Sequence, residues 1–145
     1  EQLPLVRSML TGAVVRQRTA HYSIDGTLGP YLDGLAPPPI VVGGNGKPRT
    51  ISLAARFADE LNLDSVTDLD AVRTAFARLD GDLDALERPR TDVVRSNVLL
   101  FPADVGSAAD TIAAMTEAGV ERFYLRRTID MPLERMTAFA RRFIA

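Results

Sequence analysis

Residues 38–47, Pro-Pro-Ile-Val-Val-Gly-Gly-Asn-Gly-Lys, and the following residues 50–62, Thr-Ile-Ser-Leu-Ala-Ala-Arg-Phe-Ala-Asp-Glu-Leu-Asn, decide the fold. A short β-branched run at 40–42 precedes three glycines within four residues. The apolar spacing that starts near Pro48 predicts a helix over 48–58, and residues 60–63 are typical of a further strand. Strand, turn, helix and strand in this order predict a βαβ unit with a right-handed crossover.

The glycine turn before this helix is the strongest functional signal in the sequence. Backbone N–H groups converge there beside the positive end of a helix, which is where an anionic phosphate binds. Lys47 and Arg49 lie next to the turn and either add charge to a phosphate or remain solvated. The residues alone leave a second interpretation open, because glycines also form tight strand-to-helix connections without any ligand.

The rest of the chain continues to alternate between helical and extended patterns. Upstream, the sequence predicts a short helix near residues 3–10 that stops at Gly12, extended runs at 13–17 and 20–24, a turn at 25–26, and a loop over 27–39. Downstream, it predicts a helix capped by Thr67 and interrupted or ended by Gly81, and then a polar linker or helical remnant over 82–90. A strand over 93–101 and a helix capped by Ser107 and ended at 118–119 follow. A strand over 120–125 and a last helix over 132–144 complete the chain. This order predicts an α/β fold with parallel strands, in which the runs 40–42 and 98–101 are buried.

Composition narrows the classes of function. The chain has 145 residues, a mass of 15.8 kDa, 46% hydrophobic residues and a net charge of −2 without a basic cluster, so neither nucleic acid nor an anionic membrane is expected as a partner. It contains no cysteine, which excludes disulfides and thiolate chemistry and is compatible with a cytoplasmic protein. No apolar run approaches the ~18 residues that a membrane span needs. The chain does not begin with Met, and we expect it to be a fragment or processed piece of a longer protein.

Individual polar residues do not identify a catalytic group. His21 is the only histidine, so it has no second ligand or base partner, and we expect an ordinary packed or surface residue and no metal site. Asp59 and Glu60 are expected to be solvated or paired with Arg56 and not to form an acid/base pair. The arginines at 126–127 follow the last predicted strand, where they would meet either a cofactor phosphate or a surface carboxylate.

Residues 40–46 together with 53–62 resemble the signature of bacterial luciferase-like monooxygenases and their deazaflavin-dependent relatives. Residues 5–11 followed by 22–26 resemble the segment before that signature, and residues 118–125 resemble the last barrel strand of the family. Members of this family fold as one (β/α)₈ barrel of roughly 250 residues or more. The resemblance therefore implies that residues 1–145 are one partial domain, the C-terminal half of such a barrel, without its N-terminal strands.

The resemblance also implies a cofactor and a place for it. Gly43 and Gly44 match the glycine pair that contacts the cofactor phosphate, and Asn45 and Gly46 extend the same turn. Asn62 lies at the end of the next strand, where further cofactor contacts would fall, although no lysine contact after it has a close match. The implied protein is an oxidoreductase or monooxygenase that uses coenzyme F420, or alternatively FMN, on a small organic substrate.

A rival hypothesis is that the half-barrel has no catalytic activity and acts as a binding or assembly module. Half a barrel leaves two open strand edges and an uncovered inner face. The missing N-terminal half or a second copy of the chain would have to cover them, so we expect self-association into a homo-oligomer.

Overall fold

The computed structural model describes residues 2–12, 14–26, 35–100, 105–127 and 132–143. Its centre is a parallel sheet of four strands in the order β3-β4-β5-β6, with bounds Val41–Gly44, Glu60–Asp64, Val94–Leu100 and Arg122–Arg126. Helices α2 (Pro48–Phe57), α3 (Leu69–Ala85) and α4 (Val105–Glu117) connect successive strands, a short 3₁₀ helix, η1 (Arg90–Asp92), precedes β5, and α5 (Leu133–Phe143) follows β6. The predicted α/β half-barrel, in which parallel strands alternate with helices, is confirmed.

The N-terminal part precedes this sheet as a separate small layer. Helix α1 (Gln2–Leu10) is followed by Gly12 at a φ of +76°, as expected for a glycine that ends a helix. Strands β1 (Val15–Arg18) and β2 (Ser23–Gly26) then form an antiparallel hairpin. The turn lies at residues 19–22, where the Thr19 amide donates to the Tyr22 carbonyl at 2.8 Å. The prediction of a turn at 25–26 was wrong, because these two residues pair with β1.

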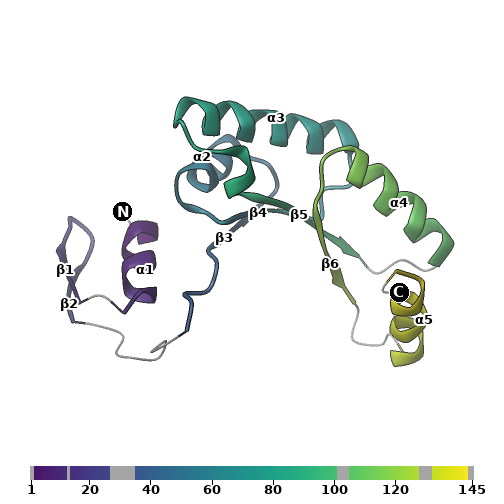
Figure 1. The fold of residues 1–145 in the computed structure, drawn as a ribbon, viewed down its shortest axis with the longest axis horizontal. Helices are drawn as coiled ribbons and strands as arrows, with labels where there is room; N and C mark the ends of the chain where they lie inside the picture. Colours follow the sequence, from purple (N-terminus) through teal and green to yellow (C-terminus); the bar gives the residue numbers. More distant parts are fainter. Residues whose placement is uncertain (1, 13, 27–34, 101–104, 128–131, 144–145) are drawn as a thin grey trace.

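The hydrophobic core lies between the sheet and the helices above it (Figure 1). Leu61 and Leu63 of β4 have no exposed surface and point toward this helical layer. The rest of the core comes from α2, α3, α4 and the residues beside them: Ile51, Ala54, Ala55, Ala58, Val72, Ala75, Phe76, Leu79, Leu83, Val93, Met115, Ala118 and Val120. One apolar layer therefore holds the central strands and the crossover helices together.

Helix α3 is longer than the sequence analysis predicted. It begins after Asp68, whose Oδ1 accepts from the Asp70 amide at 2.9 Å, so Asp68 and not Thr67 is the N-cap. It also continues through Gly81 to its last turn. Leu83 is fully buried and extends the apolar stripe, and burying a leucine contributes about 1.5–3 kcal/mol, which outweighs the ~1 kcal/mol cost of a helical glycine.

The segment from α4 to α5 differs from the prediction mainly at its boundaries. Helix α4 starts at Val105, so Ser107 lies in its first turn and is not the N-cap. The helix ends as predicted at 118–119, because Gly119 has a φ of +99° and the Val120 amide donates back to the Met115 carbonyl at 3.0 Å. Strand β6 begins two residues later than predicted. The predicted ends at 101 and 144 lie outside the described residues.

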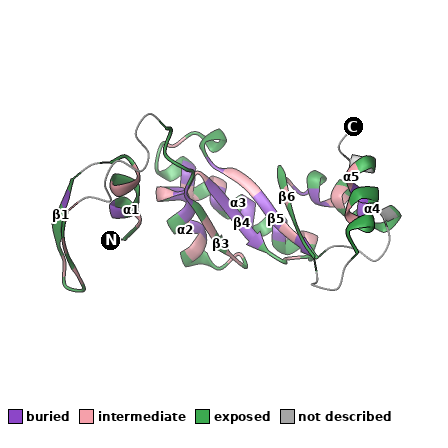
Figure 2. Ribbon diagram, turned by 90° about the horizontal axis from the view of Figure 1, so that it is seen from below, coloured by how far each residue is buried: buried purple, intermediate pink, exposed green. Residues whose placement is uncertain are grey.

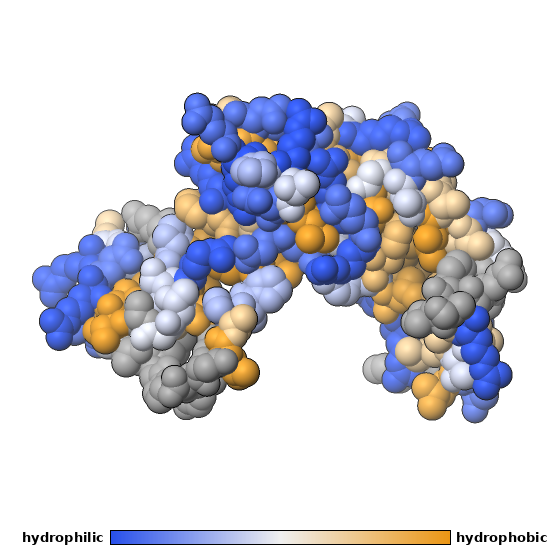
Figure 3. Space-filling view, in the orientation of Figure 1, coloured by the Kyte–Doolittle hydropathy of each residue, from blue (hydrophilic) through white to orange (hydrophobic). Residues whose placement is uncertain are grey.

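Among the described residues, helices cover the sheet on one face only. Because α2, α3 and α4 all pack on the same side, the opposite or inner face lies open beneath the arch seen in Figures 1 and 3. The expectation that the run 40–42 is buried on both faces was wrong, because Val41 is 47% exposed. The run 98–101 was expected to be buried, but Leu100 is 64% exposed. Figure 2 shows the same contrast, with β4 mostly buried and β3 and β6 largely intermediate or exposed.

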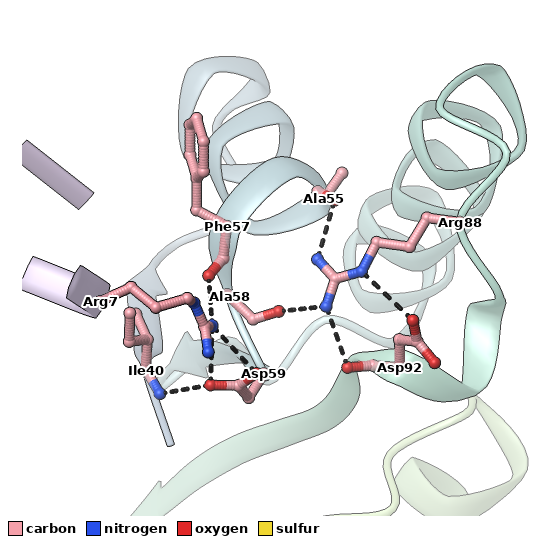
Figure 4. Close-up of polar contacts among 8 residues, drawn as sticks. All are labelled: Arg7, Ile40, Ala55, Phe57, Ala58, Asp59, Arg88 and Asp92. Atoms are coloured by element: carbon pink, nitrogen blue, oxygen red, sulfur yellow. Dashed lines mark hydrogen bonds and ion pairs between the residues drawn. The ribbon is translucent and has the colours of Figure 1, made fainter. Parts of the chain in front are cut away.

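Two arginines hold the carboxyl end of α2 (Figure 4). Arg88 donates to the Ala55 carbonyl at 3.0 Å, to the Ala58 carbonyl at 2.7 Å and to the Asp92 carbonyl at 3.2 Å. Arg7 of α1 donates to the Phe57 carbonyl at 2.8 Å. The carbonyls of Ala55, Phe57 and Ala58 have no partners within α2, and the negative end of a helix favours cations.

Asp59 continues this group of contacts to the start of β3. Its Oδ2 accepts from the Ile40 amide at 2.7 Å and from Arg7 Nη2 at 2.9 Å. Asp59 therefore pairs with Arg7, whereas the sequence analysis expected it to be solvated or paired with Arg56. Burial acts to raise the pKa of Asp59, but the Ile40 amide and the guanidinium groups of Arg7 and Arg88 hold it below its usual value. The carboxylate therefore stays ionised and ties α1, α2 and β3 to one point.

Replacing Arg88 by methionine should expose how much this contact contributes. The variant keeps an apolar side chain but leaves the α2 carbonyls without their donor, so the free energy of unfolding should fall by about 2 kcal/mol. Arg73→Met is the matched control, because the Arg73–Asp70 pair is solvent-exposed and should contribute little. Urea denaturation measures both; equal effects in the two variants would contradict the structural role of Arg88.

Candidate functional site

The predicted site residues gather at the carboxyl ends of β3 and β4. The parallel register pairs Gly43 with Asn62, and Asn62 with Ser96 on β5. The α2 crossover then brings the glycine turn to the same edge of the sheet. This is the edge at which α/β barrels and open α/β sheets bind their ligands.

Gly43 and Gly44 face opposite sides of the sheet and meet different surroundings. A Cβ atom built on Gly43 would meet nothing within 4 Å, so this position opens into empty space. A Cβ on Gly44 would lie 2.9 Å from Cγ2 of Thr50 in α2. Gly44 is therefore required by helix–strand packing, whereas the space at Gly43 is available to a ligand.

Asn45 and Gly46 line a crevice between α2 and α3. The crevice has a volume of about 360 Å³, and Pro48 and Arg78 are among its other lining residues. Gly46 has a φ of +78°, and a Cβ there would lie 3.4 Å from the Cβ of Ala75. The structure thus places the four glycine-turn residues and Asn62 along one edge of the sheet. Asn45 and Gly46 face this crevice, Gly44 faces α2, and Gly43 and Asn62 face the inner side.

The start of α2 offers backbone donors beside that crevice. Lys47 is the N-cap residue, and its side chain makes no capping hydrogen bond. The first intrahelical bond runs from the Ile51 amide to the Lys47 carbonyl at 3.1 Å. The amides of Arg49 and Thr50 precede this bond and have no acceptor within the helix, so they can donate to an anion.

Asn62 lines a hollow on the inner face of the sheet. The hollow has a volume of about 430 Å³ and is also lined by Val41, Val98, Tyr124, Leu125 and Arg126. Figure 3 shows the molecule hollowed beneath the sheet, between its two ends. The Asn62 side chain is oriented by its Nδ2, which donates to Ser96 Oγ at 2.8 Å.

Sequence analysis missed a buried carboxylate on this inner face. Glu60 is only 1% exposed, although it was expected to be solvated or paired with Arg56. Its Oε1 accepts from Ser96 Oγ at 2.6 Å, and its Oε2 is bound by Arg122 and accepts from the Tyr124 hydroxyl at 3.2 Å. These donors compensate the free-energy cost of burying the charge of Glu60.

These inner-face contacts form one chain of polar side chains. The hydrogen bond with Tyr124, together with the charge of Glu60, raises the pKa of Arg122, which therefore stays cationic. Asn62, Ser96 and Glu60 are linked in series by the bonds given above, so they hold one another in place. The signal in the sequence is the alternation of polar residues with apolar ones along β4 and β6, which places the polar residues of each strand on one face.

The remaining polar candidates have ordinary roles. Arg126 pairs with Asp64 Oδ1 at 2.6 Å, and both side chains are 52% exposed. His21 is exposed, and its amide donates to Thr19 Oγ1. Among the described residues no cluster of three or more histidine, aspartate, glutamate or cysteine side chains could hold a metal ion. Within the same ranges no helix has the length and apolar character to cross a membrane.

Comparison with solved structures supports the fold. Over 92% of its length the chain superposes on the coenzyme F420-dependent tetrahydromethanopterin reductase from Methanopyrus kandleri with a TM-score of 0.69, at 9% sequence identity. The chain spans 58% of the length of that reductase. At this identity the similarity establishes the fold alone, and at that level the resemblance found in the sequence is confirmed.

Two further structures are less similar. DmoA from Hyphomicrobium sulfonivorans matches 71% of this chain and 22% of its own at 16% identity, and the EDTA monooxygenase EmoA from Chelativorans sp. BNC1 matches 88% and 27% at 20% identity. Both TM-scores are 0.45, which is too low to support a shared fold. No family model and no curated protein matches the chain.

The two adjacent glycines should respond differently to alanine. Gly44→Ala forces a methyl group against Thr50 and should lower the free energy of unfolding by about 1–3 kcal/mol, the cost of overpacking. Gly43→Ala meets no atom of the chain and should leave stability almost unchanged. Adding Thr50→Ser to Gly44→Ala removes the clashing methyl and should restore stability. Chemical denaturation of the unmodified chain and the three variants measures these free energies of unfolding. If Gly44→Ala does not lower the stability, α2 does not pack this closely against β3.

Proposed function

We propose that residues 1–145 form the cofactor-phosphate-binding part of a cytoplasmic flavin- or deazaflavin-dependent oxidoreductase of the luciferase-like type. The cofactor we propose is coenzyme F420, with FMN as the alternative, and the substrate is a small organic molecule. The observation that carries the proposal is the edge formed by Gly43, the start of α2 and Asn62, within a fold shared with an F420-dependent reductase.

The described residues fit a phosphate-bearing cofactor. The empty space beside Gly43 lets a ligand approach the backbone closely, because no side chain fills it. The amides of Arg49 and Thr50 and the positive end of α2 favour a phosphate, and Lys47 adds a cation beside them. The crevice at Asn45 and the inner-face hollow at Asn62 provide space on both sides of this edge.

When bound, a flavin or deazaflavin supplies the redox chemistry itself. The residues of this chain would bind and orient it: Gly43 to Gly46 at its phosphate and Asn62 at a polar atom facing the inner hollow. Ser96 fixes Asn62 by accepting its amide hydrogen. No residue of the chain is assigned as an acid, base or nucleophile.

Binding titrations with F420, FMN and riboflavin test the assignment of the phosphate site. Riboflavin lacks a phosphate, so it should bind at least tenfold more weakly than FMN, and F420 should bind most tightly. Gly43→Ala should weaken F420 and FMN severalfold and affect riboflavin less, since its methyl group occupies the space next to the proposed phosphate. Fluorescence or absorbance of the cofactor gives the dissociation constants.

Gly81→Ala is the matched control for this titration. Its new Cβ also meets no atom within 4 Å, but Gly81 lies in α3, away from the glycine turn. It should bind all three molecules as the unmodified chain does. Equal affinity for FMN and riboflavin, or no change in Gly43→Ala, would rule out phosphate binding at the turn.

The open inner face supports a second candidate function, a self-associating binding or assembly module. Val41, Leu100 and Tyr124 expose apolar surface there, and within the described sheet β3 and β6 each have one neighbour only. Unpaired strand edges beside exposed apolar surface promote association. A second copy or a missing N-terminal half would cover the same face.

Sedimentation velocity at micromolar concentration measures this association. The chain should sediment as a dimer or larger species, and Val41→Glu should shift it toward monomer by placing a charge on the inner face. Val6→Glu, at a similarly exposed valine of α1, is the control and should leave association unchanged. A clean monomer at these concentrations would contradict the assembly function.

A further inference from the structure

A further cavity lies at the carboxyl ends of β5 and β6, near α4 and α5. Its volume is about 170 Å³, and its walls include Leu99, Ala108, Ile112, Leu125 and Phe139. Leu99, Ala108 and Phe139 are each no more than 6% exposed, whereas Leu100 and Leu125, which also line it, are 64% and 37% exposed, so the cavity is partly open to solvent. Figure 3 shows apolar side chains gathered over this part of the molecule.

The polar groups that the described residues contribute to this cavity are few and neutral. Ser65, Thr67 and Thr111 add hydroxyl-bearing side chains to the lining, and none of the described lining residues is charged. The Ser65 hydroxyl donates to Asp64 Oδ1 at 3.1 Å, and the Thr111 hydroxyl donates to the Ser107 carbonyl at 2.9 Å. Because both hydroxyl hydrogens are used locally, the cavity offers little to a charged ligand and would favour an apolar one.

The backbone at Ser65 is a second, independent observation. Its φ is +58°, a left-handed conformation that residues other than glycine, asparagine and aspartate seldom adopt. Such conformations concentrate at ligand sites and cost free energy that the surrounding structure must offset. Here the unusual conformation follows directly after β4, where the chain passes along the cavity.

The volume and chemistry indicate the class of ligand. Protein interiors contain few voids larger than a water molecule, and about 150 Å³ of apolar space is enough to take up benzene. We propose that this cavity is a binding site for a neutral, apolar molecule about the size of one aromatic ring. It shares no lining residue with the crevice at the glycine turn, and it borders the inner-face hollow through Val98 and Leu125.

Titration of the chain with benzene tests the proposal. Methyl NMR spectra should show saturable shifts confined to the wall residues Leu99, Ile112 and Leu125, and the melting temperature should rise with benzene concentration. Benzoate has the same ring with a charge and should produce neither effect. Saturable binding of benzoate as tight as that of benzene would overturn the assignment to neutral ligands.

Two variants on the same helix locate the binding. Ala108→Leu fills the cavity from α4 and should weaken benzene binding at least tenfold, whereas Ala113→Leu adds the same atoms at an exposed position and should bind benzene normally. If Ala108→Leu does not fold, the chemical-shift changes of the Leu99, Ile112 and Leu125 methyl groups in the unmodified chain still show whether benzene binds in the cavity. Shifts that do not saturate, or that spread over the whole core, would show that the cavity takes up no ligand.

Discussion

The constraint on which this structure depends is that three successive crossovers place their helices, α2, α3 and α4, on one face of the parallel sheet. That face has a continuous apolar core built around Leu61 and Leu63, while the opposite face remains open. The exposed apolar residues, the inner hollow and the two free strand edges all follow from this arrangement. The proposed covering partner and the proposed cofactor would therefore both contact this open face.

The residues that carry the sequence resemblance have several physical roles. Asp59 ties α1 and β3 together, Glu60 anchors the inner-face polar chain, and Gly44 makes room for Thr50. Gly43 and Asn62 are different, since both face space that a ligand can enter. The signature thus combines residues that build the edge with residues to which we assign cofactor binding in the proposed function.

Local signals were sufficient for the order of strands and helices from β3 onward, because strand runs, glycines and helical stripes are short-range patterns. They misplaced elements where burial decided the outcome, as in α3, which continues through Gly81 because Leu83 is buried. The role of Glu60 could not be predicted, since its partners Ser96 and Tyr124 are 36 and 64 residues away in the sequence. Only the parallel register brings them together.

The measurement that tests the central claim most directly is a map of amide chemical-shift changes on adding F420 to the isotope-labelled chain. If the carboxyl edge of β3 and β4 holds the cofactor, the largest changes should fall on residues 43–50 and on Asn62, and they should saturate. No saturable change in these residues, or changes confined to the opposite edge around Arg7 and Arg88, would contradict the account.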